Sequence, residues 1–185
     1  MRTSGQRLIK NIIDQIQESQ IKLGYVKETI RLYYPLSSLN NLLDSEVKTT
    51  GEMVQRLTQE FSQTTPLGEL KFGQHQGRIE ISIPPEGGAY VHEQIEVPGF
   101  LQEIISFFQM NHNSTIEEIC RIFEIYSKNY VCMQMPESAD FDYVIYFEHT
   151  SIDEYYYCIK MEMGHTIYHR FLKADYEQLI TEAAL

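Results

Sequence analysis

The stretch from Phe141 to Phe171 constrains the fold of this 185-residue chain more than any other, because it holds nine of the 22 aromatic residues. Aromatic and β-branched side chains are enriched in strands. The segments 141–148, 155–162 and 166–171 therefore predict three strands, and Met163-Gly164 predicts a tight link between the last two. Segment 141–148 is apolar on both faces, which favours a central strand that is covered on both sides.

Helical spacing dominates the first 63 residues. Apolar side chains recur at i, i+3, i+4 and i+7 from Ser4 to about Gln20, which predicts an amphipathic helix that stops near Gly24. A second helix is predicted over 26–34, because Pro35 would end it. A short third helix is predicted over 36–43. The pattern Thr49-x-x-Glu52 is a capping box and predicts a fourth helix.

The period then changes from helical to alternating. Residues 69–83 alternate apolar and polar side chains around a glycine-bounded centre, which predicts a hairpin. The proline- and glycine-rich stretch 84–88 is the best loop candidate of the chain.

An internal helix pair is predicted next. Pro98 suits the first position of a helix, and Ser114-x-x-Glu117 matches a second capping box. A further strand is predicted over 130–135.

Together these elements predict an α+β fold, in which N-terminal helices and an internal helix pair pack on a mainly antiparallel sheet of about five to six strands. A final helix is predicted over 175–184. The length fits one domain over residues 1–185. Within it, the change of period suggests a soft subdivision into a helical part, 1–63, and a mixed part, 64–185.

Charge is distributed unevenly along the chain. Residues 1–60 carry eight Lys/Arg against seven Asp/Glu, whereas residues 61–185 carry seven against 19, so the second segment has a net charge of −12. Such acidity opposes nucleic acid and anionic membranes, which bind basic surfaces. It would steer a basic protein partner to the surface, although it also serves solubility alone.

No sequence feature directs the chain to a membrane or out of the cell. No apolar run approaches the length of a membrane helix, and the first residues lack the apolar core of a secretory signal. The three cysteines, Cys120, Cys132 and Cys158, are odd in number and form no Cys-x-x-Cys pair. We therefore expect three reduced, buried thiols in a cytoplasmic protein.

The densest group of ligand-type side chains lies in the aromatic segment: Glu148, His149, Glu162, His165 and His169. Glu162 and His165 flank the predicted turn and could meet. His165 and His169 are about 13 Å apart along an extended strand, which is too far to share a metal ion. Histidines that are hydrogen-bonded among tyrosines on a sheet face are the favoured explanation of the group, and a cleft for a ligand or metal or for acid–base work is the alternative. We predict no metal and no cofactor.

Other motifs are incomplete. The sequence from His92 to Glu96 lacks the second histidine of a zinc protease, and a long helix is not expected there. Residues 98–128 read as helix, break and helix, but the second helix lacks the net positive charge of a recognition helix. Tyr155-Tyr156-Tyr157 could stack on bases, yet the acidity of the chain speaks against an RNA partner.

Three stretches together resemble a known family: Ile21–Tyr25, Arg31–Leu36 and Met163–Phe171. They are similar to an uncharacterised bacterial family, a domain of unknown function, over most of the chain. The resemblance implies no activity, cofactor or catalytic residue. It implies a bacterial, cytoplasmic, single-domain protein.

Three hypotheses of function follow from the sequence. Because no catalytic motif is complete, the first is a non-catalytic binding module whose acidic surface holds a basic protein partner. The second is a small enzyme or a ligand- or metal-binding protein whose cleft is formed by the five Glu and His side chains named above. The third is a structural subunit that exists as a homo-oligomer.

Overall fold

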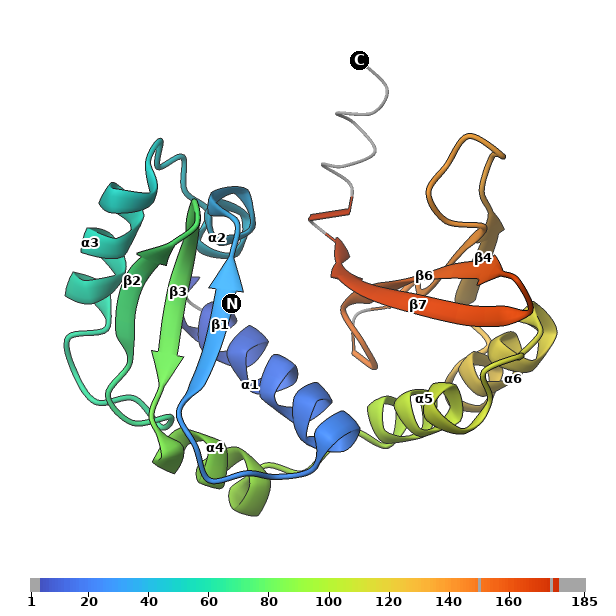
Figure 1. Ribbon diagram of the computed structural model, residues 1–185, viewed down its shortest axis with the longest axis horizontal. Coiled ribbons are helices and arrows are strands. Elements are labelled where there is room, and N and C mark those ends of the chain that lie inside the picture. The colour runs from blue at the N-terminus through green and yellow to red at the C-terminus, as the bar shows by residue number, and fades with distance from the viewer. Residues whose placement is uncertain (1–3, 150, 174, 177–185) are drawn as a thin grey trace. The chain divides into compact units, whose positions relative to one another are not determined.

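The computed structural model describes residues 4–149, 151–173 and 175–176 (Figure 1). The chain divides after Glu96 into two compact units, residues 1–96 and 97–185, and each unit has its own sheet. The described residues form six helices and seven strands, and every strand pair is antiparallel. The predicted α+β class is therefore confirmed, with two sheets in place of one.

The described residues of the first unit form four helices and three strands. The strand order is β1-β3-β2, so β3 is the central strand. The predicted subdivision at residue 63 falls inside this unit, because strands from both sides of that residue pair with each other. The elements are α1 Ser4–Leu23, β1 Ile30–Tyr34, α2 Leu36–Leu43, α3 Thr50–Glu60, β2 Lys71–His75, β3 Arg78–Ile83 and α4 Pro85–Gln94.

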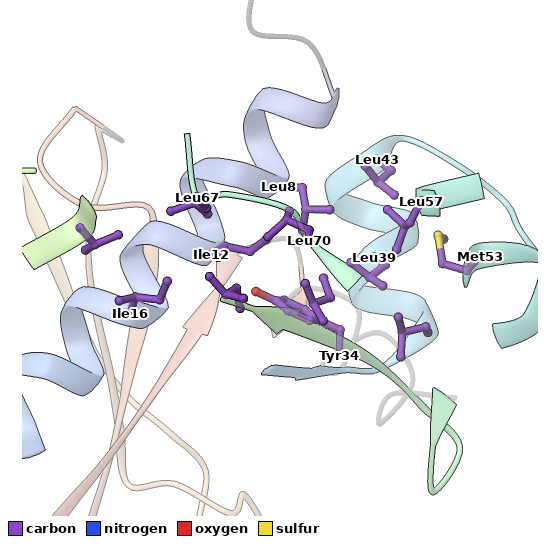
Figure 2. Packing of buried hydrophobic residues seen from close by; sticks show 14 residues of the cluster. Leu8, Ile12, Ile16, Tyr34, Leu39, Leu43, Met53, Leu57, Leu67 and Leu70 are labelled. Carbon is purple, nitrogen blue, oxygen red and sulfur yellow. The ribbon is translucent and has the colours of Figure 1, made fainter. Parts of the chain in front are cut away.

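The core of the first unit lies between its helices and its sheet. Leu8, Ile12 and Ile16 of α1 are fully buried, and Figure 2 shows them meeting side chains of α2, α3 and the sheet. A polar contact is buried beside them, where the Tyr34 hydroxyl donates to the Asn11 side chain at 2.8 Å. The labelled residues are Leu8, Ile12, Ile16, Tyr34, Leu39, Leu43, Met53, Leu57, Leu67 and Leu70.

The predicted helix over 26–34 is wrong, because this segment contains strand β1. Residues 26, 30 and 33 fit helical spacing, but Ile30, Leu32 and Tyr34 fit an alternating pattern equally well. The register pairs Leu32 with Ile81, in the central strand β3. Pairing with a preformed hairpin satisfies the backbone of this short segment and buries its alternate side chains, which an isolated helix of this length could not do.

The predicted loop over 84–88 is also wrong, because helix α4 begins at Pro85. Proline suits the first helical position, since it lacks only an N–H group that would have no partner there. Gly87 permits close packing: an added Cβ would lie 2.4 Å from the Leu67 carbonyl oxygen and 2.4 Å from the Ile83 side chain. The helix extends past His92 but ends at Gln94, so Glu96 lies outside it.

The described residues of the second unit form helices α5 and α6 and a four-stranded sheet of order β4-β5-β6-β7. The predicted C-terminal strands and the tight link between the last two are confirmed. The predicted helix over 175–184 lies, from residue 177 on, outside the described residues. The elements are α5 Gly99–Met110, α6 Ile116–Tyr126, β4 Tyr130–Gln134, β5 Tyr143–Phe147, β6 Tyr155–Glu162 and β7 His165–Leu172.

Aromatic rings form the core between the helix pair and this sheet. Phe100 of α5 meets Phe147 of β5 edge-on with ring centroids 4.7 Å apart, and it meets Phe123 of α6 at 4.9 Å. The opposite face of β5 is buried as well, because Val144 packs with Cys158 and Tyr176. The prediction of a central strand covered on both sides is confirmed.

Helix α6 begins one residue later than predicted. Thr115, not Ser114, is its N-cap, and the reciprocal bonds join Thr115 to Glu118. Ser114 is buried and donates to the Asn111 carbonyl at 2.6 Å. Both serine and threonine can cap a helix, so the sequence contains two possible capping boxes, one starting at Ser114 and one at Thr115.

A buried ion pair links β7 to the segment before β6. Arg170 and Asp153 lie 3.1 Å apart, and their side chains are only 4% and 5% exposed. The Tyr157 hydroxyl donates to Asp153 and accepts from Arg170, both at 3.1 Å, and the Arg170 guanidinium lies 3.5 Å from the centre of the Tyr155 ring. Burial raises the pKa of Tyr157 well above its usual value, so the hydroxyl keeps its proton and can donate to Asp153.

Candidate functional site

The turn between β6 and β7 brings two of the predicted residues together. Met163 and Gly164 both have positive φ, at 51° and 78°, and form the two-residue turn of the hairpin. Glu162 and His165 are cross-strand partners on either side of it. The Met163 side chain is 92% exposed at the tip. Sequence spacing alone placed this pair correctly, because a two-residue turn fixes the register of its strands.

An open hollow of about 430 Å³ lies beside this turn. Its walls come from the hairpin and from the connection between α5 and α6. The Thr166 N–H donates to the His112 carbonyl at 2.6 Å, and its hydroxyl donates to the Ser114 carbonyl at 2.8 Å, so this connection is attached to β7. The lining residues are His112, Glu162, Met163, His165, Thr166 and Ile167.

The other predicted residues lie away from this hollow. Glu148 and His149 follow the end of β5, near the start of β6, whereas Glu162 ends β6. The seven-residue step from 155 to 162 spans about 23 Å in a strand. His169 pairs with Cys158 in the middle of the hairpin, and its ring lies 5.5 Å from that of Phe141.

The five predicted residues therefore occupy three places on the sheet: Glu148 and His149 follow β5, Glu162 and His165 flank the turn, and His169 lies between these two ends. Ligand binding by Glu162 and His165 stays a prediction. In the part of the chain that the structure describes, no three His, Cys, Asp or Glu side chains are grouped closely enough to hold a metal ion. His112 was missed by sequence reasoning, since its place depends on how a distant loop packs on β7.

Acidic residues concentrate in the second unit. Residues 97–185 contain five Lys/Arg and 14 Asp/Glu, a net charge of −9, whereas residues 1–96 contain ten and 12, a net charge of −2. Several cations of the second unit are held internally: Arg170 pairs with Asp153, Lys160 pairs with Asp142, and Lys173 donates to the Phe147 carbonyl. Five cations cannot neutralise 14 carboxylates, so the unit keeps its net charge of −9.

Four carboxylates lie at the same end of the second sheet, where Lys160 pairs with one of them, Asp142. The register places the β4–β5 connection at the same end as the β6–β7 turn, since Gln134 pairs with Tyr143 and Tyr143 with Ile159. The Met161 N–H donates to the Asp142 carboxylate at 2.6 Å, which holds this connection against β6. We call this group the acidic sheet end, and it comprises Glu137, Asp140, Asp142 and Glu162. Asp142 is half-buried and the other three are exposed.

The thiols are less uniform than the sequence suggested. Cys158 is buried as expected, but Cys120 is half-buried and Cys132 is exposed, so the prediction of three buried thiols is wrong for these two. The apolar neighbours of Cys132 in the sequence are misleading because β4 is an edge strand of the sheet.

These observations define a small α+β protein of two sheet-containing units, with an acidic end on the second sheet. The chain belongs to the bacterial family described as "Domain of unknown function, E. rectale Gene description (DUF3877)", whose model matches residues 5–180. The resemblance seen in the sequence is thereby confirmed. No curated protein and no solved structure matches the chain. Among the helices described, none is both long enough and apolar enough to cross a membrane.

Proposed function

We propose that this protein is a non-catalytic binding module that holds a basic segment of a protein partner at the acidic sheet end. The observation that carries the proposal is the gathering of four carboxylates at one end of a sheet whose unit has a net charge of −9. Opposite charges on two proteins steer their encounter and select their relative orientation more than they add affinity.

The hairpin tip offers the apolar contact that such a surface needs. Met163 is 92% exposed and Ile167 is 45% exposed, and both line the hollow beside Glu162. A lysine or arginine side chain has an apolar stem and a charged head. Its stem can lie on Met163 and Ile167 while its head pairs with Glu162. Methionine adapts its shape readily and is common at surfaces that bind peptides.

A charge-neutral variant tests the proposal. The triple change Glu137→Gln, Asp140→Asn and Glu162→Gln removes three exposed charges from the acidic sheet end. The matched control, Glu28→Gln, Glu46→Gln and Glu69→Gln, removes three exposed charges from the first unit. Both variants are used with the wild type to capture proteins from cell lysate at low and high salt, and mass spectrometry identifies the captured proteins.

We expect the wild type and the control to retain a Lys/Arg-rich protein at low salt and to release it at high salt, because exposed charges are screened beyond about 10 Å at 0.1 M salt. The acidic-end variant should lose it. Equal capture by both triple variants would refute the acidic sheet end as the binding surface. Circular dichroism checks that both variants fold.

A second candidate function is small-ligand binding in the hollow, with Glu162 and His165 as the polar groups. The volume of about 430 Å³ favours it, since ligand pockets span about 300–1,000 Å³. A screen of small anions and fragments by NMR would show shifts of the His112 and His165 ring protons for a true ligand. The change His165→Asn should weaken that binding at least several-fold, whereas His75→Asn, in the first unit, should not. Shifts that persist in the His165 variant would contradict this role.

A further inference from the structure

Two of the three cysteines lie where a helix packs on a strand: Cys120 is in α6 and Cys132 is in β4. Helix α6 packs on the edge strand β4. Cys120 lies one helical turn before Phe123 on α6, so it is on the side of the helix that meets this strand. The influence of each thiol on the pKa of the other agrees with this placement. Tyr130 points to the same face of β4 as Cys132, because the two are two residues apart in a strand. Its ring lies 6.1 Å from that of Phe123 in α6, and its hydroxyl contacts the Cys120 thiol. Both thiols are free.

The two thiols differ in the way that a two-step exchange reaction requires. Cys132 is exposed and can meet a reagent from solution, whereas Cys120 is half-buried behind it. Contact with Cys120 lowers the pKa of the Cys132 thiol, and the same contact, with burial, raises the pKa of the Cys120 thiol. The thiolate is the nucleophile in disulfide exchange, so Cys132 is the thiol that attacks first.

We propose that Cys120 and Cys132 form a redox-active pair, which closes to an intramolecular disulfide by exchange with a low-molecular-weight disulfide. The Cys132 thiolate attacks one sulfur of the reagent, forms a mixed disulfide and releases the first small thiolate. Cys120 then loses its proton to solvent and attacks the Cys132 sulfur, which releases the second small thiolate. The protein loses two hydrogens, and the reagent is reduced to two thiols.

The fold leaves room for this closure. A disulfide needs its sulfurs about 2.05 Å apart, so closure must bring the two thiols to this distance. Strand β4 is hydrogen-bonded on one side only, to β5, where Cys132 pairs with Ile145. A short connection over 127–129 joins α6 to β4, so the strand can shift toward the helix without breaking a second ladder. The Tyr130 hydroxyl can donate to the Cys120 thiolate as it forms.

The test uses the full chain and oxidised glutathione as the probe. After incubation, remaining thiols are blocked with N-ethylmaleimide, and intact mass and peptide maps count the modified cysteines. We expect the wild type to pass through a glutathione adduct on Cys132 and to end with a disulfide between residues 120 and 132, which dithiothreitol reverses. The Cys158 thiol should stay reduced, because it is buried.

Three variants separate the roles of the thiols. Cys120→Ser should stop at the glutathione adduct on Cys132, Cys132→Ser should leave Cys120 unmodified, and Cys158→Ser should behave as the wild type. The wild-type time course gives an answer even if a variant fails to fold. A lasting adduct in the wild type, a disulfide that involves Cys158, or three unreacted thiols would each overturn the proposal.

Discussion

At the scale of single residues, the second unit buries a group of polar side chains that the sequence did not reveal. In the sequence Asp153 is one acid among many, yet its side chain is buried with that of Arg170 in strand β7. Its second oxygen accepts from the Tyr155 N–H at 2.8 Å. A linear pattern cannot show such a group, since the partners meet only through the pairing of β6 with β7.

We predict that Asp153→Asn lowers the free energy of unfolding by about 3–5 kcal/mol, because it leaves the Arg170 guanidinium buried without its counter-charge. Lys160→Gln removes a half-exposed ion pair to Asp142 and should cost less than about 1 kcal/mol. Urea unfolding followed by tyrosine fluorescence measures both. If the two variants were equally stable, the buried pair would not be a main source of stability.

At the scale of elements, strong local periodicity predicted most of the structure. The long amphipathic helix, the capping box at Thr49, the hairpin of β2 and β3, and the three C-terminal strands all have local signals, and they are confirmed. The wrong predictions concern segments whose secondary structure depends on packing against distant residues. The glycines of α4 suggested a loop. The structure shows instead that a helix passes close to Leu67 and Ile83 here, and only glycine at position 87 leaves room for it.

The candidate site divides in the same way. Glu162 and His165 were placed together because a two-residue turn is a local feature. The acidic sheet end depends on strand order, and the contact of Cys120 with Cys132 depends on how α6 packs on β4. Sequence spacing carries neither of these, so the sequence could assign an acidic surface to the chain but not a position for it.

At the scale of the whole molecule, each unit has a core of its own. The apolar cluster of the first unit is built from residues 8–91, and the aromatic cluster of the second from residues 100–157. A unit with its own core can unfold on its own. We therefore predict two transitions in calorimetry of the full chain, whereas the single-domain prediction requires one.

Two variants assign the transitions. Gly87→Ala places a Cβ 2.4 Å from the Leu67 carbonyl oxygen and should destabilise the first unit by about 1–3 kcal/mol. Asp153→Asn should destabilise the second unit only. If the units are independent, each variant shifts a different transition, and their effects add when they are combined. One transition that both variants lower would mean that the units fold as a single domain, since a change in either core would then be felt by the whole chain.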